Sequence, residues 1–200
     1  MLIRNANQAD IDEIVEVHIA AFPGFFLTKM GKKFLTELYS AFSNQSFGLL
    51  RVALDADNKI IGFAAGTTAP EQYFTLLRKA KWLCFLLAAI PGIIKHPFVV
   101  LRKLYYAMFY GGDKPAQIGQ VALLSSIAVL PEMSGKAIGK ALLSDFEQQV
   151  KRQDVKGLYL TTDKHGNDAV VAFYTKAGYR VENGFTQPDG REMLRLIKSF

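Results

Sequence analysis

Cysteine is scarce in this sequence, with Cys84 as its one representative among 200 residues. A lone cysteine excludes a disulfide within the chain and cannot build a cysteine-based zinc site. It also fits a reducing compartment. We therefore expect a cytoplasmic protein with no metal site.

Long apolar runs are missing as well. The longest, Trp82–Ile94, is interrupted by Pro91 and Gly92 and falls well short of the roughly 20 residues that cross a bilayer as a helix. The first ten residues contain no apolar stretch behind a basic leader, so no secretory signal is predicted. The sequence therefore favours a soluble protein.

Acidic residues are absent from positions 78–112, the most apolar part of the chain. Six basic residues lie there: Arg78, Lys79, Lys81, Lys95, Arg102 and Lys103. The rest of the chain balances 18 basic residues (24 minus these six) against 18 acidic ones, so the whole net charge of +6 falls in this one segment.

What is present suits a folded domain. Half of the residues are hydrophobic and 12% are aromatic, and a length of 200 residues matches one domain of ordinary size. No repeat, low-complexity tract or long linker divides the chain. We therefore expect residues 1–200 to form a single domain.

Hydrophobic periodicity and turn signals predict an α/β fold with a mixed central sheet flanked by helices. Strands are expected at 2–4, 48–53, 60–68, 120–129, 157–162, 179–185 and 192–198. Helices are expected at 10–21, capped by Asn7 or Asp10, and at 32–42, 135–153 and 167–177, with a turn at 23–28. A helical block at 70–114, broken near Pro91–Gly92 and Pro97, is inserted between the third and fourth strands.

The most informative stretch is Leu124–Leu143, where a strand ends at Val129 and a loop containing Gly135 leads into a helix. Free N–H groups at a helix start suit a phosphate or pyrophosphate, and Lys136 and Lys140 add positive charge. A Walker A loop fails on spacing, because three residues rather than four separate Gly135 from the next Gly-Lys pair and alanine follows it. The dinucleotide fingerprint Gly-x-Gly-x-x-Gly is absent.

At these residues the chain resembles the GNAT superfamily of N-acetyltransferases, in which a strand leads to Arg/Gln-x-x-Gly-x-Gly/Ala. The resemblance implies acetyl-CoA as cosubstrate. It implies that main-chain groups of Ile127, Ala128 and Val129 bind the pantetheine arm and the thioester carbonyl. The pyrophosphate would be bound by Ser134, Gly135, Lys136, Ala137, Ile138, Gly139 and Lys140. Ser134 stands where arginine or glutamine is usual, and Ala137 where glycine is usual.

A second stretch, Asn167–Tyr179, is similar to the family's asparagine followed by a helix that carries a tyrosine and ends in Lys-x-Gly. Asn167 suits a helix cap and Gly178 a helix end in their own right. By resemblance, Asn167 contacts the pantetheine and Tyr174 protonates the departing CoA thiolate. The alternative is that the aromatic side chains of this helix only pack in the core.

The residue that takes the proton from the acceptor amine is not assigned by the sequence. Family members often carry an acidic residue on the strand before Ile127, but residues 120–126 contain none. The candidates are His165, Asp163 and Glu71, or an ordered water chain. His18 lies on an apolar helix face, which is typical of a packed core histidine.

These observations predict an enzyme that acetylates a primary amine of a small molecule. Two rivals stay open: a sensor that binds acyl-CoA without turnover, and an acyltransferase for a longer acyl chain or a lipid-linked acceptor. The block at 70–114 has three interpretations: a cap packed on the sheet or on a second subunit, a lid over the acceptor, or attachment to an anionic membrane through residues 78–112. The block is too apolar to favour nucleic-acid binding.

Overall fold

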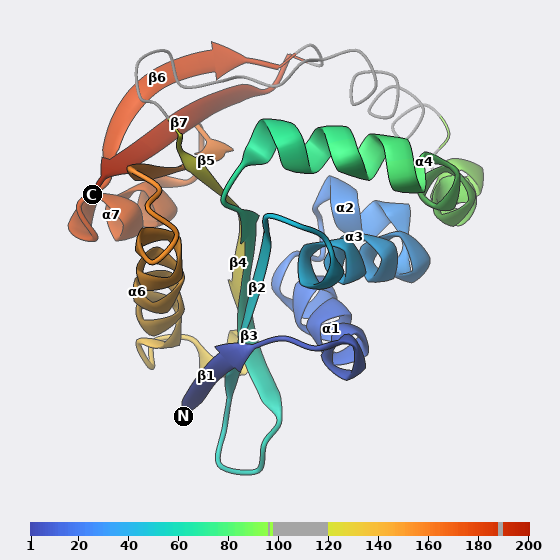
Figure 1. Ribbon diagram of the computed structural model, residues 1–200, viewed down its shortest axis with the longest axis horizontal. Helices are drawn as coiled ribbons and strands as arrows, with labels where there is room; N and C mark the ends of the chain where they lie inside the picture. The colour runs from blue at the N-terminus through green and yellow to red at the C-terminus, as the bar shows by residue number, and fades with distance from the viewer. Residues whose placement is uncertain (96, 98–119, 188–189) are drawn as a thin grey trace.

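Figure 1 shows the computed structural model of the protein, which describes residues 1–95, 97, 120–187 and 190–200. A seven-stranded sheet has the order β1-β2-β3-β4-β5-β7-β6. All neighbours are antiparallel except β4 and β5, which are parallel. The strands are β1 (Leu2–Asn5), β2 (Gly48–Leu54), β3 (Ile60–Thr67), β4 (Ala122–Val129), β5 (Gly157–Asp163), β6 (Arg180–Thr186) and β7 (Glu192–Ser199). This confirms the predicted mixed α/β sheet.

Helices cover both faces of the sheet (Figure 1). One face carries α1 (Ile11–Ala21), α2 (Phe26–Met30), α3 (Lys32–Asn44) and α4 (Pro70–Lys95), and the other carries α6 (Ile138–Lys151) and α7 (Asp168–Lys176). Two short 3-10 helices, η1 (Gln8–Asp10) and η2 (Pro131–Met133), precede α1 and α6. Each face buries its own apolar cluster. The sheet therefore separates an α1–α4 side from an α6–α7 side.

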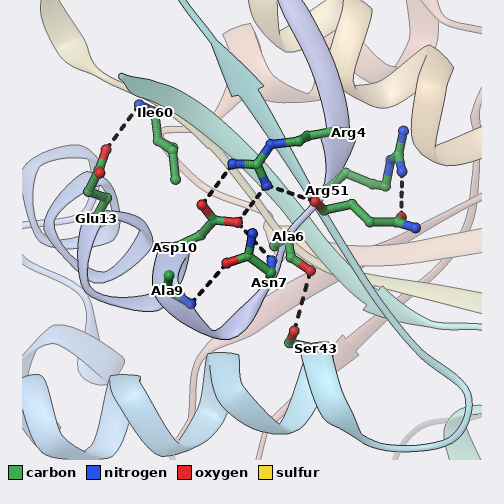
Figure 2. A network of polar contacts seen from close by, with 10 residues as sticks. Arg4, Ala6, Asn7, Ala9, Asp10, Glu13, Ser43, Arg51 and Ile60 are labelled. Carbon is green, nitrogen blue, oxygen red and sulfur yellow. Dashed lines mark hydrogen bonds and ion pairs between the residues drawn. The ribbon is translucent and has the colours of Figure 1, made fainter. Parts of the chain in front are cut away.

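The N-terminal strand and the first helix are joined by a polar network (Figure 2). The Arg4 guanidinium donates two hydrogen bonds to Asp10, at 2.6 and 2.8 Å, and holds the pKa of that carboxyl below its usual value. Asp10 also accepts from the Asn7 amide at 2.7 Å, as half of a capping box at η1. Of the two predicted caps, Asn7 provides the side-chain cap, and Asp10 anchors β1.

The helical block between β3 and β4 begins as predicted, but the predicted break at Pro91–Gly92 is wrong. Helix α4 continues through Pro91 to Lys95. Gly92 packs so tightly against α2 that an added Cβ would lie 2.9 Å from the carbonyl oxygen of Lys29. Packing against α2 thus outweighs the cost of a proline inside the helix. The remainder of the block, residues 98–114, lies outside the described residues.

The predicted turn at 23–28 is also shorter than expected, because α2 begins at Phe26. The Thr28 hydroxyl donates to the carbonyl of Phe22 at 2.6 Å and fastens α2 to the end of α1. Met30 follows in a small apolar cluster with Ala89 of α4, and both are fully buried. Helix α2 is therefore held by a hydrogen bond to the end of α1 and by packing against α4.

Candidate functional site

The sheet opens between β4 and β5. These parallel strands pair only at Ala122 with Leu158 and at Leu123 with Tyr159, whereas β4 stays paired with β3 as far as Val129. From residue 124 onward, the β5-facing edge of β4 has no strand partner in the described part of the chain. Because main-chain groups of a strand alternate between its two edges, some N–H and C=O groups there are available to a ligand.

A bulge lies where the strands separate. Ala65 of β3 pairs with Ser126 and Gly66 pairs with Leu124, which leaves Ser125 of β4 without a partner of its own. A Cβ on Gly66 would come within 2.0 Å of the Leu123 carbonyl oxygen, so this close approach requires glycine. A bulge bends and twists its strand. Here it turns the second half of β4 away from β5.

The three cofactor-strand residues predicted from the sequence lie on this open half. The Ala128 side chain is buried on the α1–α4 side, while Ile127 and Val129 pack against the cluster on the α6–α7 side. Their side chains are therefore taken up by the two cores. What the open edge offers a ligand at these residues is therefore main-chain groups, and their binding to the pantetheine arm stays a prediction.

Helix α6 starts beside this gap without a side-chain cap. Its N-cap residue Ala137 has φ +58°, and Gly135 has φ +78°. The Ser134 amide is bonded to the Pro131 carbonyl at 3.1 Å, and the Ala141 amide is the next to find a backbone acceptor, the Ala137 carbonyl at 3.0 Å. Within the described residues, the six amides of residues 135–140 have no backbone acceptor.

These amides make the start of α6 suited to an anion. The positive end of the helix dipole points to the same place, and the side chains of Lys136 and Lys140 are exposed there. The left-handed conformation of Ala137 explains why glycine is usual at this position, since a Cβ is unfavourable in that region. Six donors, a dipole and two lysines fit a pyrophosphate.

Asn167 stands at the N-cap position of α7, but the predicted side-chain cap is wrong. Its carboxamide nitrogen donates instead to the Thr162 hydroxyl and to the Asp163 carbonyl, 3.4 Å away, at the end of β5. These two bonds fix the orientation of the carboxamide, and its oxygen accepts no hydrogen bond from the first amides of α7. Asn167 therefore ties α7 to the strand that borders the gap. Gly178, with φ +91°, ends the helix region as predicted.

Tyr174 lies on α7 with 5% of its surface exposed. Its ring meets Phe173 and Tyr179 edge to face, with centroids 5.0 and 5.5 Å apart. Burial raises the pKa of its phenol, so the hydroxyl keeps its proton at neutral pH. The ring belongs to the α6–α7 cluster, and the packing interpretation is correct as far as the ring is concerned.

The three candidate bases named from the sequence differ in their surroundings. His165 is exposed and its Nε2 pairs with Glu192, while Asp163 receives two hydrogen bonds from the Arg191 guanidinium. Glu71 is exposed in the first turn of α4. Asp163 is thus paired with a cation and His165 is hydrogen bonded to a carboxylate, so neither is an obvious free base.

His18 is the core histidine that its helix face predicted. Its Nδ1 lies 2.6 Å from the Tyr39 hydroxyl, and burial lowers its pKa to about 4. The Tyr39 phenol also hydrogen bonds the hydroxyl of Ser126, in the open half of β4. Sequence reasoning missed Tyr39 and Ser126, because no local pattern connects positions 18, 39 and 126.

A hollow of about 450 Å³ lies on the α1–α2 connection, lined by residues 21–26 and Arg191. The Arg191 guanidinium lies over the Phe25 ring at 5.7 Å and is bound to Asp163 at the end of β5. The hollow thus connects the start of β7 with the end of α1. Within the described residues, no group of three or more metal-binding side chains occurs.

Known proteins share this fold. The model of the acetyltransferase (GNAT) family matches residues 11–179. No curated protein matches the sequence significantly.

Several solved structures resemble the whole chain. The ribosomal-protein-S18-alanine N-acetyltransferase from Escherichia coli is 14% identical with a TM-score of 0.62, over 99% of this chain and 92% of that one. The PaiA N-acetyltransferase from Thermoplasma acidophilum, in complex with coenzyme A, is 20% identical with a TM-score of 0.59, over 100% and 98%. Naa20 from Chaetomium thermophilum, in complex with a bisubstrate analogue, is 16% identical with a TM-score of 0.62, over 100% and 87%.

Proposed function

This chain belongs to the acetyltransferase (GNAT) family, and from that premise we propose that it transfers an acetyl group from acetyl-CoA to a primary amine of a small molecule. The observation that carries the proposal is the uncapped start of α6, where six amides without backbone acceptors lie beside the open edge of β4. Residues 135–137 and 140 are exposed, so these amides can exchange water for the oxygens of an anionic ligand.

Two groups of residues bind the cosubstrate in this proposal. The amides of Gly135, Lys136, Ala137, Ile138, Gly139 and Lys140 donate to its pyrophosphate, and Ser134 contributes its hydroxyl because its amide is already bonded. Main-chain groups of Ile127, Ala128 and Val129 bind the pantetheine arm along the open edge. Asn167, fixed to the end of β5, borders the same channel.

The chemistry follows from what these groups offer. The acceptor nitrogen attacks the thioester carbonyl carbon, and a carbon–nitrogen bond forms as the carbon–sulfur bond breaks. Main-chain N–H groups near Ile127–Val129 stabilise the negative charge that develops on the carbonyl oxygen. Tyr174, protonated at neutral pH, gives its proton to the leaving thiolate, and the proton that the attacking nitrogen releases as the amide forms restores the phenol through solvent.

His18 does not act as the base in this scheme. A pKa of about 4 makes its imidazole too weak to take a proton from an alkylammonium group, whose pKa is near that of lysine at about 10. The amine therefore loses its proton to water. The chain His18–Tyr39–Ser126 holds fixed dipoles against strand β4.

A small acceptor fits the hollow beside Arg191. Its volume of about 450 Å³ is within the range of small-molecule sites, roughly 300–1,000 Å³. The Arg191 charge is balanced by Asp163, so an approaching ammonium group is not repelled by an isolated guanidinium. One of the similar structures is named as a ribosomal-protein-S18-alanine N-acetyltransferase. Peptide amines therefore belong in any substrate panel.

A thiol-release assay with acetyl-CoA tests the proposal, using a panel of small primary amines and short peptides with free N-termini. The expected result is acceptor-dependent release of coenzyme A with at least one small amine. Acetylation of peptides alone would show that the acceptor is a peptide amine and not a small molecule. Tight binding of coenzyme A without release for any amine would support the sensor alternative. Faster release from longer acyl-CoA thioesters would support the rival acyl donor.

A further inference from the structure

Helix α4 is apolar on two opposite faces. Its inner face buries Tyr73, Leu77, Ala88, Ala89 and Gly92. Its outer face exposes Leu76, Trp82, Leu83, Leu86, Leu87, Ile90 and Ile94, each by 43% to 75% of its surface. At about 100° per residue, these seven side chains fall within one continuous stripe. We call this stripe the outer face of α4.

An exposed stripe of this kind is unusual for a monomeric soluble protein. Helices that cover a sheet ordinarily present charged and polar residues to solvent, as α6 does with Lys140, Ser144, Gln148 and Lys151. The other large exposed apolar side chains of the described residues are spread over several elements. The outer face of α4 therefore indicates a partner that accepts apolar side chains.

The charge around the stripe indicates the chemistry of that partner. Lys79 lies within the stripe and Arg78 beside it, and both are exposed, whereas Lys81 is paired with Glu37 at 3.0 Å. Glu71 is the single acidic residue of α4. The partner must therefore combine an apolar interior with negative charge at its surface. A second copy of this chain would bring the same positive charges to the contact and repel the first.

We propose that the outer face of α4 binds to an anionic lipid surface, with Trp82 and the neighbouring aliphatic side chains at the boundary of headgroups and acyl chains and the basic residues among the phosphates. Amphipathic helices bind lipid surfaces in this way. In the described part of the chain, no helix could span a bilayer, so the contact is peripheral. This extends to α4 the membrane interpretation of residues 78–112, of which 98–112 lie outside the described residues.

This orientation is compatible with the site described above. Helix α6 lies on the opposite side of the sheet from α4 (Figure 1), so a protein resting on α4 keeps the start of α6 away from the lipid. The cosubstrate would reach the protein from the aqueous side. The inference itself does not depend on acetyl transfer.

Co-sedimentation of the full-length protein with vesicles tests the inference, using phosphatidylcholine alone and phosphatidylcholine mixed with phosphatidylserine. The wild-type protein is expected to sediment with the mixed vesicles and to be released by high salt. The double variant Trp82→Gln/Leu87→Gln should reduce the bound fraction at least tenfold. Val181→Gln, which changes an exposed apolar residue of β6, is the matched control and should bind as the wild type does.

Thermal unfolding of each variant checks that the fold is intact, and binding is measured without acetyl-CoA, so loss of enzyme activity has no bearing on it. Equal binding of the double variant and the control would overturn the inference. So would absence of binding to mixed vesicles. A dimer in sedimentation velocity that dissociates in the double variant would assign the outer face to a second copy instead.

Discussion

The two sides of strand β4 are built from different kinds of polar group. Toward α6 and α7, the available groups are main-chain amides at the start of α6, which have no backbone acceptor within the described residues. Toward α1 and α3, the polar groups are side chains: the buried His18 and Tyr39, which are hydrogen bonded to each other, and the half-buried Ser126, which bonds Tyr39. The α6–α7 side therefore has hydrogen-bond donors available to a ligand, whereas most polar groups on the α1–α3 side are already bonded to one another.

This difference explains how β4 can fix the core with its side chains and still offer main-chain groups to a ligand. Ile127 and Val129 pack toward the α6–α7 side and Ala128 toward the other, so side chains fix the strand and its main chain stays available. We expect ligand affinity to respond to changes at the α6 loop. We expect stability, above all its dependence on pH, to respond to changes at His18. Four predictions test this division, from the largest effect to the smallest.

Replacement of Tyr174 by phenylalanine is the most severe test of the α6–α7 side. Because the substitution removes the proton donor and keeps the buried ring, kcat should fall about 100-fold or more while affinity for coenzyme A is retained. Steady-state kinetics and calorimetric titration measure the two quantities. Tyr73→Phe removes another buried hydroxyl, far from α7, and should keep its activity. Full activity of Tyr174→Phe would show that Tyr174 only packs.

The pH dependence of stability tests the α1–α3 side. The pKa of His18 is about 4 when folded and 6.5 when unfolded, so the folded state binds fewer protons. Its contribution is present above pH 6.5 and is lost as pH falls toward 4. Between about pH 7 and pH 5 the loss is about 2 kcal/mol in the free energy of unfolding.

Urea unfolding of wild-type protein and His18→Gln at both pH values measures this effect. The variant lacks the titrating group. Between pH 7 and pH 5 its free energy of unfolding should therefore fall by about 2 kcal/mol less than that of the wild type. Parallel stability curves for the two proteins would mean that His18 is solvated or charged in the folded state. That result would contradict a buried, neutral histidine on the α1–α3 side of β4.

Substitution of Gly135 by valine addresses the loop at α6. A β-branched residue is strongly disfavoured at φ +78°, so the loop must shift and its amides lose their alignment. The dissociation constant for coenzyme A should rise about tenfold, because a charge-assisted hydrogen bond contributes about 1.5–3 kcal/mol. Gly190→Val imposes a similar backbone strain, at φ +86°, in the hairpin between β6 and β7. Equal loss of affinity in both variants would show that the loop at Gly135 has no specific part in binding coenzyme A.

The smallest effect is expected from Ala137→Gly. Glycine relieves the left-handed strain at φ +58°, which outweighs the added freedom of the unfolded chain, and stability should rise by up to about 1 kcal/mol. Ala141→Gly, inside the same helix, should instead cost about 1 kcal/mol. Thermal unfolding compares the two. A similar loss in both variants would mean that Ala137 is not strained.

The sequence predicted one side of β4 far better than the other. Gly135, Ala137 and Tyr174 lie in short local patterns, and helix starts and glycine turns follow from neighbouring residues. The order of strands and helices was likewise predictable from periodicity. The contact of His18 with Tyr39 and Ser126 was not, because it joins α1, α3 and β4 and depends on how these elements pack.

The wrong predictions have the same origin. Pro91 was expected to break a helix, but packing of Gly92 on α2 keeps α4 continuous. Asn167 was expected to cap α7 with its side chain, but bonds from its carboxamide nitrogen to the end of β5 fix the group in an orientation in which its oxygen accepts from no helix amide. The charge of residues 78–112 was visible in the sequence. Which face of α4 remains exposed was not, because both faces are apolar.

The central claim is that amides at the start of α6 bind the diphosphate of coenzyme A. Amide chemical shifts recorded by NMR during titration with coenzyme A, and separately with pantetheine, test it most directly because pantetheine lacks the diphosphate. The account predicts that the amides of Gly135, Lys136 and Gly139 shift strongly with coenzyme A and little with pantetheine. Unchanged amides at these positions in the presence of saturating coenzyme A would contradict it.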